Sequence, residues 1–239
     1  MDNPRERHIS DYEILEKVGE TARSVVYRAR KAGTERTVII KMLSARYPSP
    51  AETARFKHEY ELIRSIHTEG VIKVFDIIDA FDGVALVLED FGGVSLRQLI
   101  PAGFTLVRFL DLAVRISEIL GALHQKGITH RDIKPNNILL NQDADILKLA
   151  DFGIASEFTR QNEEIYNPVV LEGTLAYISP EQTGRMNRSV DYRTDLYSLG
   201  VTFYEMLTGH VPFMSHDPME IIHSHIARQP ARVHTLNPD

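Results

Sequence analysis

The residues with the clearest chemical potential lie in two polar segments in the second half of the chain. His130–Asn137 reads HRDIKPNN, and Asp151–Gly153 reads DFG. Carboxylate and amide oxygens are hard ligands that suit Mg²⁺. A third candidate, Lys41, ends the apolar run VIIK and can neutralise negative charge. These residue types suit a reaction that needs a metal ion, a cation and an oriented acceptor group.

The first third of the chain has the pattern of a sheet with one inserted helix. Short runs rich in β-branched residues alternate with turn residues such as Gly19 and Gly33, which is typical of strands. One charged stretch instead repeats apolar residues at helical spacing, including Phe56 and Ile63. We predict strands over 12–18, 25–30, 36–42, 71–78 and 84–88, and a helix over 51–67.

After Phe91 the pattern becomes mainly helical. Gly127 and Gly209 each end an amphipathic stretch, as helix C-terminal glycines do. Asp217–Pro218 has the pattern of an N-cap followed by the first helical residue. We predict helices over 106–123 and 194–208 and one beginning at 217, extended segments at 137–140 and 146–149, and a loop over 229–239.

Four motifs occur in a fixed order on these elements. They are VIIK, HRDIKPNN, DFG and the tripeptide SPE at Ser179–Glu181. The set resembles the signature of eukaryotic-like serine/threonine protein kinases, over about residues 12–228. The resemblance implies an α+β, bilobal kinase-like fold with Mg·ATP in the cleft. After an N-terminal extension, 1–11, an N-lobe over 12–91 would hold an antiparallel sheet plus one helix, and a mainly helical C-lobe would occupy 92–239.

The resemblance also assigns catalytic roles. Phosphoryl transfer needs charge neutralisation, metal ions and an oriented hydroxyl. Asp132 would accept or orient the hydroxyl proton, and Lys134 would lie beside the γ-phosphate. Asn137 and Asp151 would be the Mg²⁺ ligands. His130 is expected to be structural, as a buried histidine bonded to backbone near Asp151.

Lys41 would hold the α- and β-phosphates of ATP and requires a carboxylate partner on the inserted helix. Glu59 and Glu61 both lie there. We prefer Glu59, because Ile63, one turn later, then falls on the core face.

The adenine site is expected at Leu88–Phe91, which would form the hinge. Backbone groups of Glu89 and Phe91 would meet the adenine edge. Plain core packing is an equally open interpretation of the apolar residues. The expected walls of the site are Val26 and Ile39, with Leu139 or Leu140 beneath the ring.

The phosphate loop departs from the family pattern. Gly19 matches the first glycine of the motif, whereas Thr21 and Ser24 occupy the positions of the other two. Glycine allows close backbone approach and positive φ. One interpretation is an active kinase with a stiffer lid, and the alternative is a pseudokinase that serves as a nucleotide sensor or scaffold. On sterics alone, glycine at Thr21 and Ser24 is expected to tighten Mg·ATP binding.

Substrate class rests on Lys134 and Thr174, which resemble their counterparts in kinases that act on Ser and Thr in signal transduction. A small-molecule phosphotransferase with a kinase-like core is a further alternative. An arginine directly before the catalytic aspartate, as Arg131 is here, resembles the pattern of kinases whose activation loop is ordered by an acidic group. Candidates for that group are phosphorylated Thr159 or Tyr166, or the carboxylates of Glu163, Glu164 and Glu172.

Composition limits the other function classes. The 239 residues carry a formal charge of −6 and no cysteine, which excludes a disulfide framework and cysteine-based zinc sites and favours a cytoplasmic protein. We expect no nucleic-acid partner and no membrane span. His223 and His225 are two residues apart and would face different sides of a helix, which disfavours a zinc site.

The segment Glu172–Arg188 is longer and more basic than is usual at this place in the family. It resembles the N-terminal kinase module of large bacterial proteins that join a kinase to an ATPase, a GAF domain and a histidine kinase. Downstream signalling domains of the same polypeptide are therefore expected partners, beside protein substrates. We also expect the C-lobe to be truncated, because Glu181 pairs with a later arginine in the family and Arg228 and Arg232 lie too early.

Overall fold

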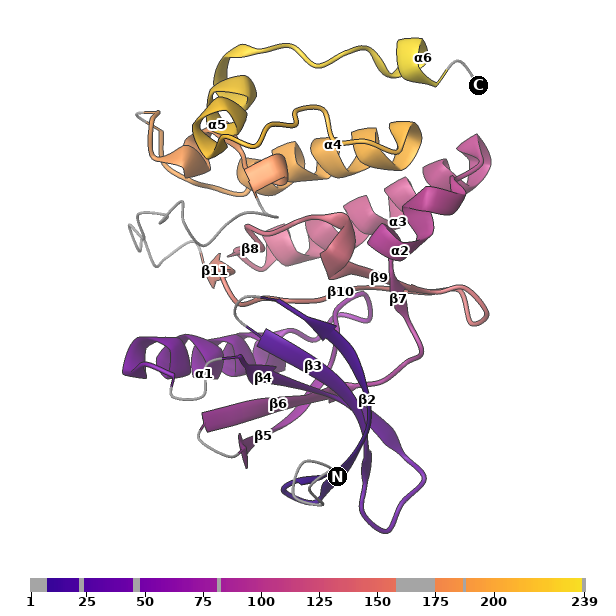
Figure 1. Ribbon diagram of the computed structural model, residues 1–239, viewed down its shortest axis with the longest axis vertical. Coiled ribbons are helices and arrows are strands. Elements are labelled where there is room, and N and C mark those ends of the chain that lie inside the picture. The colour runs from indigo at the N-terminus through magenta and orange to yellow at the C-terminus, as the bar shows by residue number, and fades with distance from the viewer. Residues whose placement is uncertain are drawn as a thin grey trace. The chain divides into compact units, whose positions relative to one another are not determined.

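The computed structural model describes residues 8–21, 24–44, 48–80, 83–157, 175–186 and 188–237. The chain forms two compact units, Met1–Gly92 and Gly93–Asp239. Figure 1 shows the first as a sheet with one helix and the second as mainly helical. The predicted α+β class with an antiparallel N-terminal sheet is confirmed.

The first unit is built on a six-stranded sheet in which every neighbouring pair is antiparallel. Its order is β1-β2-β3-β4-β6-β5. β1 adds an edge strand that the sequence pattern did not predict, and its Ile9 is 1% exposed. The strands are β1 (His8–Ile9), β2 (Tyr12–Glu20), β3 (Ser24–Lys31), β4 (Thr37–Leu43), β5 (Val74–Ala80) and β6 (Gly83–Glu89).

Helix α1 (Pro50–Ser65) begins at a capping box. The Ser49 hydroxyl accepts from the amide of Glu52, and the Glu52 carboxylate accepts from the amide of Ser49. These bonds satisfy two amides that the helix leaves unpaired. The helix contacts β5 and β6 through a buried side at Phe56, Glu59, Leu62 and Ile63.

The second unit is organised around α3 (Leu106–Gln125) and α4 (Arg193–Thr208). Buried residues of α3 recur every three or four positions, and Thr105 caps its first turn. Gly209 ends α4 in a left-handed conformation, φ 77°. The other elements are β7 (Val94–Ser95), α2 (Leu96–Leu99), η2 (Ile100–Ala102), β8 (Ile128–Thr129), η3 (Pro135–Asn137), β9 (Ile138–Asn141), β10 (Ile146–Leu149), β11 (Ser156–Glu157), η5 (Leu175–Tyr177) and η6 (Pro180–Thr183).

Two short helices complete the second unit. α5 (Pro218–Ala227) begins at Asp217, whose carboxylate accepts from the amide of Met219, as the N-cap pattern predicts. The expected loop over 229–239 is wrong in part, because Val233–Leu236 forms α6. Asn237, after α6, donates to the carbonyl of Leu207 at 2.8 Å and attaches this segment to the end of α4.

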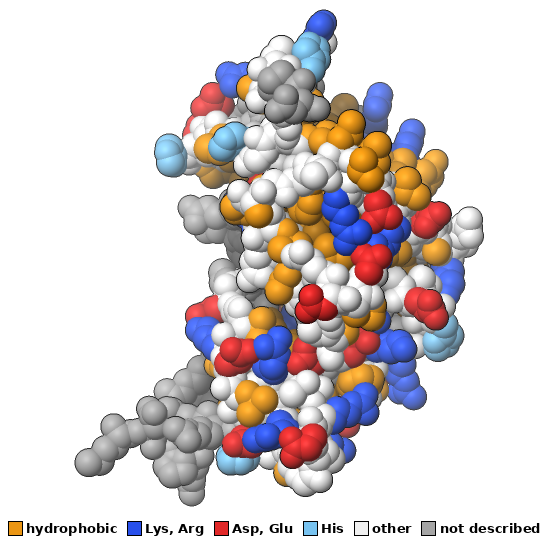
Figure 2. Space-filling model, turned by 90° about the vertical axis from the view of Figure 1, so that its right-hand side faces the viewer, with side chains coloured by type: hydrophobic (Ala, Val, Ile, Leu, Met, Phe, Trp, Pro, Cys, Tyr) orange, Lys and Arg blue, Asp and Glu red, His pale blue; other side chains and the backbone are white. Residues whose placement is uncertain are grey.

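The outer side of α3 is also apolar. Val107 is 79% exposed and Val114 57%. Figure 2 shows hydrophobic side chains gathered on the surface of the second unit. No helix in the described part of the chain is long and apolar enough to cross a membrane.

Candidate active site

Lys41 and Glu59 form a buried ion pair in the first unit. Lys41 Nζ, on β4, donates to Glu59 Oε1, on α1, at 2.7 Å. Glu59 is 2% exposed and Lys41 8%. Glu61 lies on the exposed side of the same helix. The structure therefore places Glu59, rather than Glu61, against the lysine.

The strand register places the residues predicted to meet the nucleotide on one face of this sheet. Lys41 is opposite Val26, and Ile39 is opposite both Arg28 and Leu88. Side chains alternate between the two faces of a strand. The intervening residues Ala29, Val38, Ile40 and Val87 accordingly belong to a hydrophobic core on the other face.

The predicted phosphate loop joins β2 to β3 and is closed by hydroxyl contacts. The amide of Ser24 donates to Thr21 Oγ1 at 3.0 Å, and the amide of Thr21 donates to the Ser24 carbonyl at 2.8 Å. The two hydroxyls lie 3.2 Å apart, and Ser44 Oγ donates to the Thr21 carbonyl at 3.1 Å. A Cβ at Gly19 would meet nothing within 4 Å. Ala22 and Arg23 lie outside the described residues.

In the second unit, Asp132 lies at the centre of a polar cluster. Lys134 Nζ donates to Asp132 Oδ2 at 2.7 Å and to Oδ1 at 3.0 Å. Asn137 Nδ2 donates to Oδ2 at 2.9 Å and to the Asp132 carbonyl at 2.8 Å. Burial raises the pKa of Asp132, and the ammonium of Lys134 opposes that effect. The cluster therefore contains a strengthened base with a cation beside it.

Asp195, on α4, positions the backbone of this loop. Its carboxylate accepts from the amides of His130 at 2.8 Å and Arg131 at 2.6 Å, and it lies 2.8 Å from His124 Nε2. Asp195 is fully buried. Sequence reasoning missed this role. The available signal was a carboxylate one helical turn before the apolar residue Leu199, which places both on the buried side of α4.

His130 is structural, as expected. Its Nε2 lies 3.1 Å from the Ala150 carbonyl, and its Nδ1 accepts from the amide of Asp132 at 3.3 Å. Arg131 and Asp151, on either side of this contact, have φ values of 66° and 65°. Left-handed backbone at residues other than glycine is uncommon and clusters at functional sites.

The sequence of this chain matches the model of the protein kinase domain over residues 12–237. The chain belongs to the protein kinase domain family. It is 36% identical over 218 residues to a probable serine/threonine-protein kinase of Clostridium perfringens, covering 90% of this chain and 31% of that protein. It is 32% identical over 231 residues to the serine/threonine-protein kinase PknB of Mycobacterium tuberculosis, covering 93% of this chain and 36% of PknB. The chain spans about a third of the length of these curated relatives.

In this kinase domain, the predicted hinge, Leu88–Phe91, begins with the last two residues of β6. The amide of Glu89 donates to the Lys73 carbonyl at 3.0 Å, and the Glu89 carboxylate accepts from the amide of Lys73 at 2.7 Å. Leu140, one of the two candidates for the floor of the adenine site, is 1% exposed. Leu139, the other candidate, retains partly exposed surface.

The kinase domain also holds its SPE segment against α4. The Ser198 hydroxyl donates to the Tyr177 carbonyl at 2.8 Å, and Ser179 Oγ bonds to the Thr194 hydroxyl. Tyr177 OH donates to the buried Glu205 carboxylate at 2.6 Å. Burial and this contact raise the pKa of Tyr177. The predicted residues Thr159, Glu163, Glu164, Tyr166, Glu172 and Thr174 lie outside the described residues.

Glu181, the last residue of the SPE segment, retains exposed surface. It is half-buried and lines a surface hollow of about 290 Å³ with Arg188, Arg193 and Tyr197. Solvent therefore reaches the hollow that contains this carboxylate.

Proposed function

We propose that this kinase domain transfers the γ-phosphate of ATP to Ser or Thr hydroxyls of protein substrates. The observation that carries the proposal is the Asp132 carboxylate, held by Lys134 at 2.7 Å and by Asn137 at 2.9 Å. A base in this environment can receive the hydroxyl proton while a cation neutralises charge on the phosphate. The relatives named as serine/threonine-protein kinases support the same substrate class.

The residues in the second unit fit a Mg²⁺ ion. Asn137 bonds to Asp132 through Nδ2, and its amide Oδ1 is a hard oxygen of the kind that Mg²⁺ binds. Asp151 supplies a carboxylate. Mg²⁺ is commonly held by one or two protein groups plus substrate phosphates, so a cluster of three acidic or histidine ligands is not required. When bound, Mg²⁺ neutralises charge that develops on the phosphates.

Side chains of this protein carry out the remaining steps of the transfer. Lys41, paired with Glu59 at 2.7 Å, contacts the α- and β-phosphates. Asp132 accepts the proton of the substrate hydroxyl as that oxygen bonds to the γ-phosphorus. The bond from phosphorus to the β–γ bridging oxygen breaks with its electron pair, and ADP leaves. Lys134 neutralises the transferred group.

The test is transfer of radiolabelled phosphate from ATP, with Mg²⁺, to the chain itself and to a generic basic protein. We expect label on phosphoserine or phosphothreonine and its loss in Asp132→Asn. Nucleotide binding without transfer would support the pseudokinase alternative. Label on a small molecule only would support the phosphotransferase alternative.

A further inference from the structure

Asp90, inside the predicted hinge, uses both carboxylate oxygens within the first unit. Oδ2 accepts from Arg28 Nε at 2.9 Å, and Oδ1 accepts from the amide of Gly92 at 3.2 Å. The Asp90 side chain is 8% exposed. Gly92 has a φ of 70°, so the backbone turns where Asp90 holds it. One oxygen therefore fixes the turn of the hinge, and the other attaches the hinge to the sheet.

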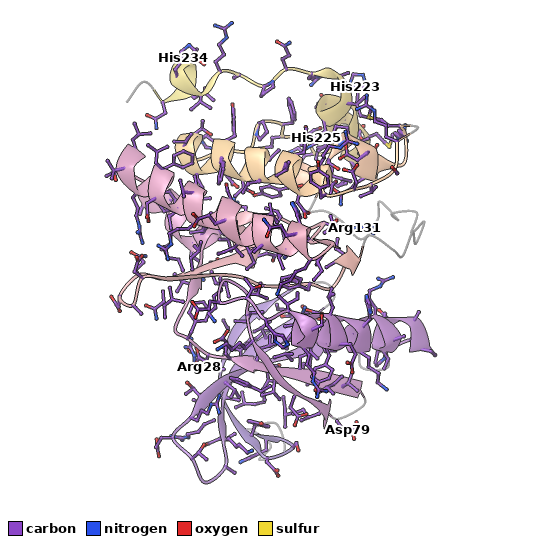
Figure 3. The ribbon with its side chains drawn as sticks, turned by 180° about the vertical axis from the view of Figure 1, so that it is seen from behind. Arg28, Asp79, Arg131, His223, His225 and His234 are labelled. Carbon is purple, nitrogen blue, oxygen red and sulfur yellow. The ribbon has the colours of Figure 1, made fainter. Side chains whose placement is uncertain are left out.

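Arg28 lies on β3, 62 residues before Asp90 in the chain (Figure 3). It occupies the same face of the sheet as Val26, Ile39 and Lys41, which are the residues predicted to meet the nucleotide. Its guanidinium also pairs with Glu16 of β2. Arg28 consequently retains a partner when Asp90 loses its charge.

The hinge is held from the opposite side as well. Glu89 exchanges two hydrogen bonds with the backbone of Lys73, at 3.0 Å and 2.7 Å. Asp90 and Glu89 thus attach consecutive residues to two different parts of the unit. Groups held by several partly buried hydrogen bonds keep a narrow range of orientations.

We propose that Asp90, acting through Arg28 and the amide of Gly92, is a positioning residue that makes the nucleotide site select adenine over guanine. This inference rests on the proposed ATP-dependent function. Adenine presents an amino donor at the position where guanine presents a carbonyl acceptor. Backbone groups reject the wrong base only if they stay in place, because the wrong base then leaves them unpaired. A hinge freed from Arg28 can reorient and accept guanine.

The variants Asp90→Asn and Arg28→Met test the proposal. Asparagine retains an oxygen that can accept from Gly92, so Asp90→Asn removes mainly the charged contact. Arg30→Met is the matched control, because Arg30 also lies on β3 and pairs with a residue of β2, Glu13, at 3.0 Å. All variants are made in an Asp132→Asn background, so that nucleotide is bound without turnover. Thermal unfolding establishes that each variant is folded.

The measurement is the Kd of Mg·ATP and of Mg·GTP by calorimetry. We expect Asp90→Asn and Arg28→Met each to lower the preference for ATP by roughly 3- to 10-fold, the range of one ordinary hydrogen bond between backbone and base. The double variant should lose no more than either single one, because the two residues form one contact. Arg30→Met should keep the preference.

Equal losses of ATP and GTP affinity would reduce Asp90 to a structural role and overturn the inference. An unchanged preference in both single variants would also overturn it, and the proposed function would stand. Absence of nucleotide binding in the parent chain would overturn the proposed function, and the inference with it. If Asp90→Asn fails to fold, Arg28→Met decides alone, since its partner Asp90 retains the Gly92 contact.

Discussion

Lys41 and Glu59 lie on a strand and a helix 18 residues apart and form an ion pair of 2.7 Å in which both residues are less than 10% exposed. Two charges removed from water are stable only as a pair, so each residue requires the other. The pair also fixes the position of α1 relative to β4. The ion pair therefore makes the position of the Lys41 ammonium, proposed to contact the phosphates of ATP, depend on the folding of the first unit.

The variant Lys41→Met removes that cation. We expect phosphate transfer to fall by about 10²–10⁴-fold, because charge on the phosphates is no longer neutralised. It also removes the Lys41 contact of the buried Glu59 carboxylate, which costs about 3–5 kcal/mol of unfolding free energy. Transfer rates and melting temperatures measure the two effects. Lys41→Met with Glu59→Leu is the control that restores stability without activity, and wild-type transfer in either variant would contradict the assignment.

Asp132→Asn keeps the size of the side chain and removes the base. Transfer should fall by roughly 10²–10⁴-fold, the usual contribution of a positioned general base. The melting temperature should change little, since Asn137 and Lys134 retain an oxygen to contact. Asp143→Asn, at an exposed aspartate in the turn between β9 and β10, is the matched control. Equal rates for the two variants would show that Asp132 is not the base.

The hydroxyl contacts of the phosphate loop reverse the expectation drawn above from the missing glycines. The amide of Ser24 donates to Thr21 Oγ1 at 3.0 Å, so these two residues are held together before nucleotide binds. Glycine at both positions adds conformational freedom that binding must remove. We expect Thr21→Gly with Ser24→Gly to weaken Mg·ATP binding by about 2- to 10-fold, with adenosine affinity unchanged.

Calorimetry with both ligands checks this prediction. Thr21→Ser is the control, because it keeps the hydroxyl that accepts from Ser24. Tighter ATP binding in the glycine variant would show that the steric argument from sequence was the better one.

His225 makes the second unit sensitive to acid. It is 5% exposed, and its Nδ1 lies 2.8 Å from Tyr197 OH (Figure 3). Burial lowers the pKa of His225 from about 6.5 to about 4. Between these values the unfolded chain binds a proton that the folded chain does not. The free energy of unfolding should therefore be highest above pH 6.5 and fall as the pH decreases toward 4.

Denaturant titrations at several pH values test this dependence. His225→Gln should flatten the curve over that interval, whereas His223→Gln, at an exposed histidine of the same helix, should leave it unchanged. An unaltered slope in His225→Gln would assign the acid sensitivity to other groups.

The main helices and strands and the reactive motifs were predictable from sequence because each depends on local pattern, whereas β1 and α6 were missed. The apolar stripe of α3 and the caps at Ser49 and Asp217 depend on residues within a turn or two. Glu59 was also predictable as the partner of Lys41, because helical spacing places it on a different side of the helix from Glu61. The buried acceptors Asp195 and Glu205 were not, because their partners lie far away in the chain. The same holds for Asp90, whose partner Arg28 is set by strand register.

The position of Asp195 in the chain determines when the loop at His130 and Arg131 can fold during synthesis on the ribosome. The carboxylate that accepts from His130 and Arg131 is encoded 65 and 64 residues after them. At about 5–20 residues per second, the two amides emerge roughly 3 to 13 seconds before their acceptor. During that interval the loop lacks the group that sets its left-handed turn. The nascent chain therefore completes this loop only after α4 has been synthesised and has docked, which delays the proposed phosphate transfer until most of the second unit exists.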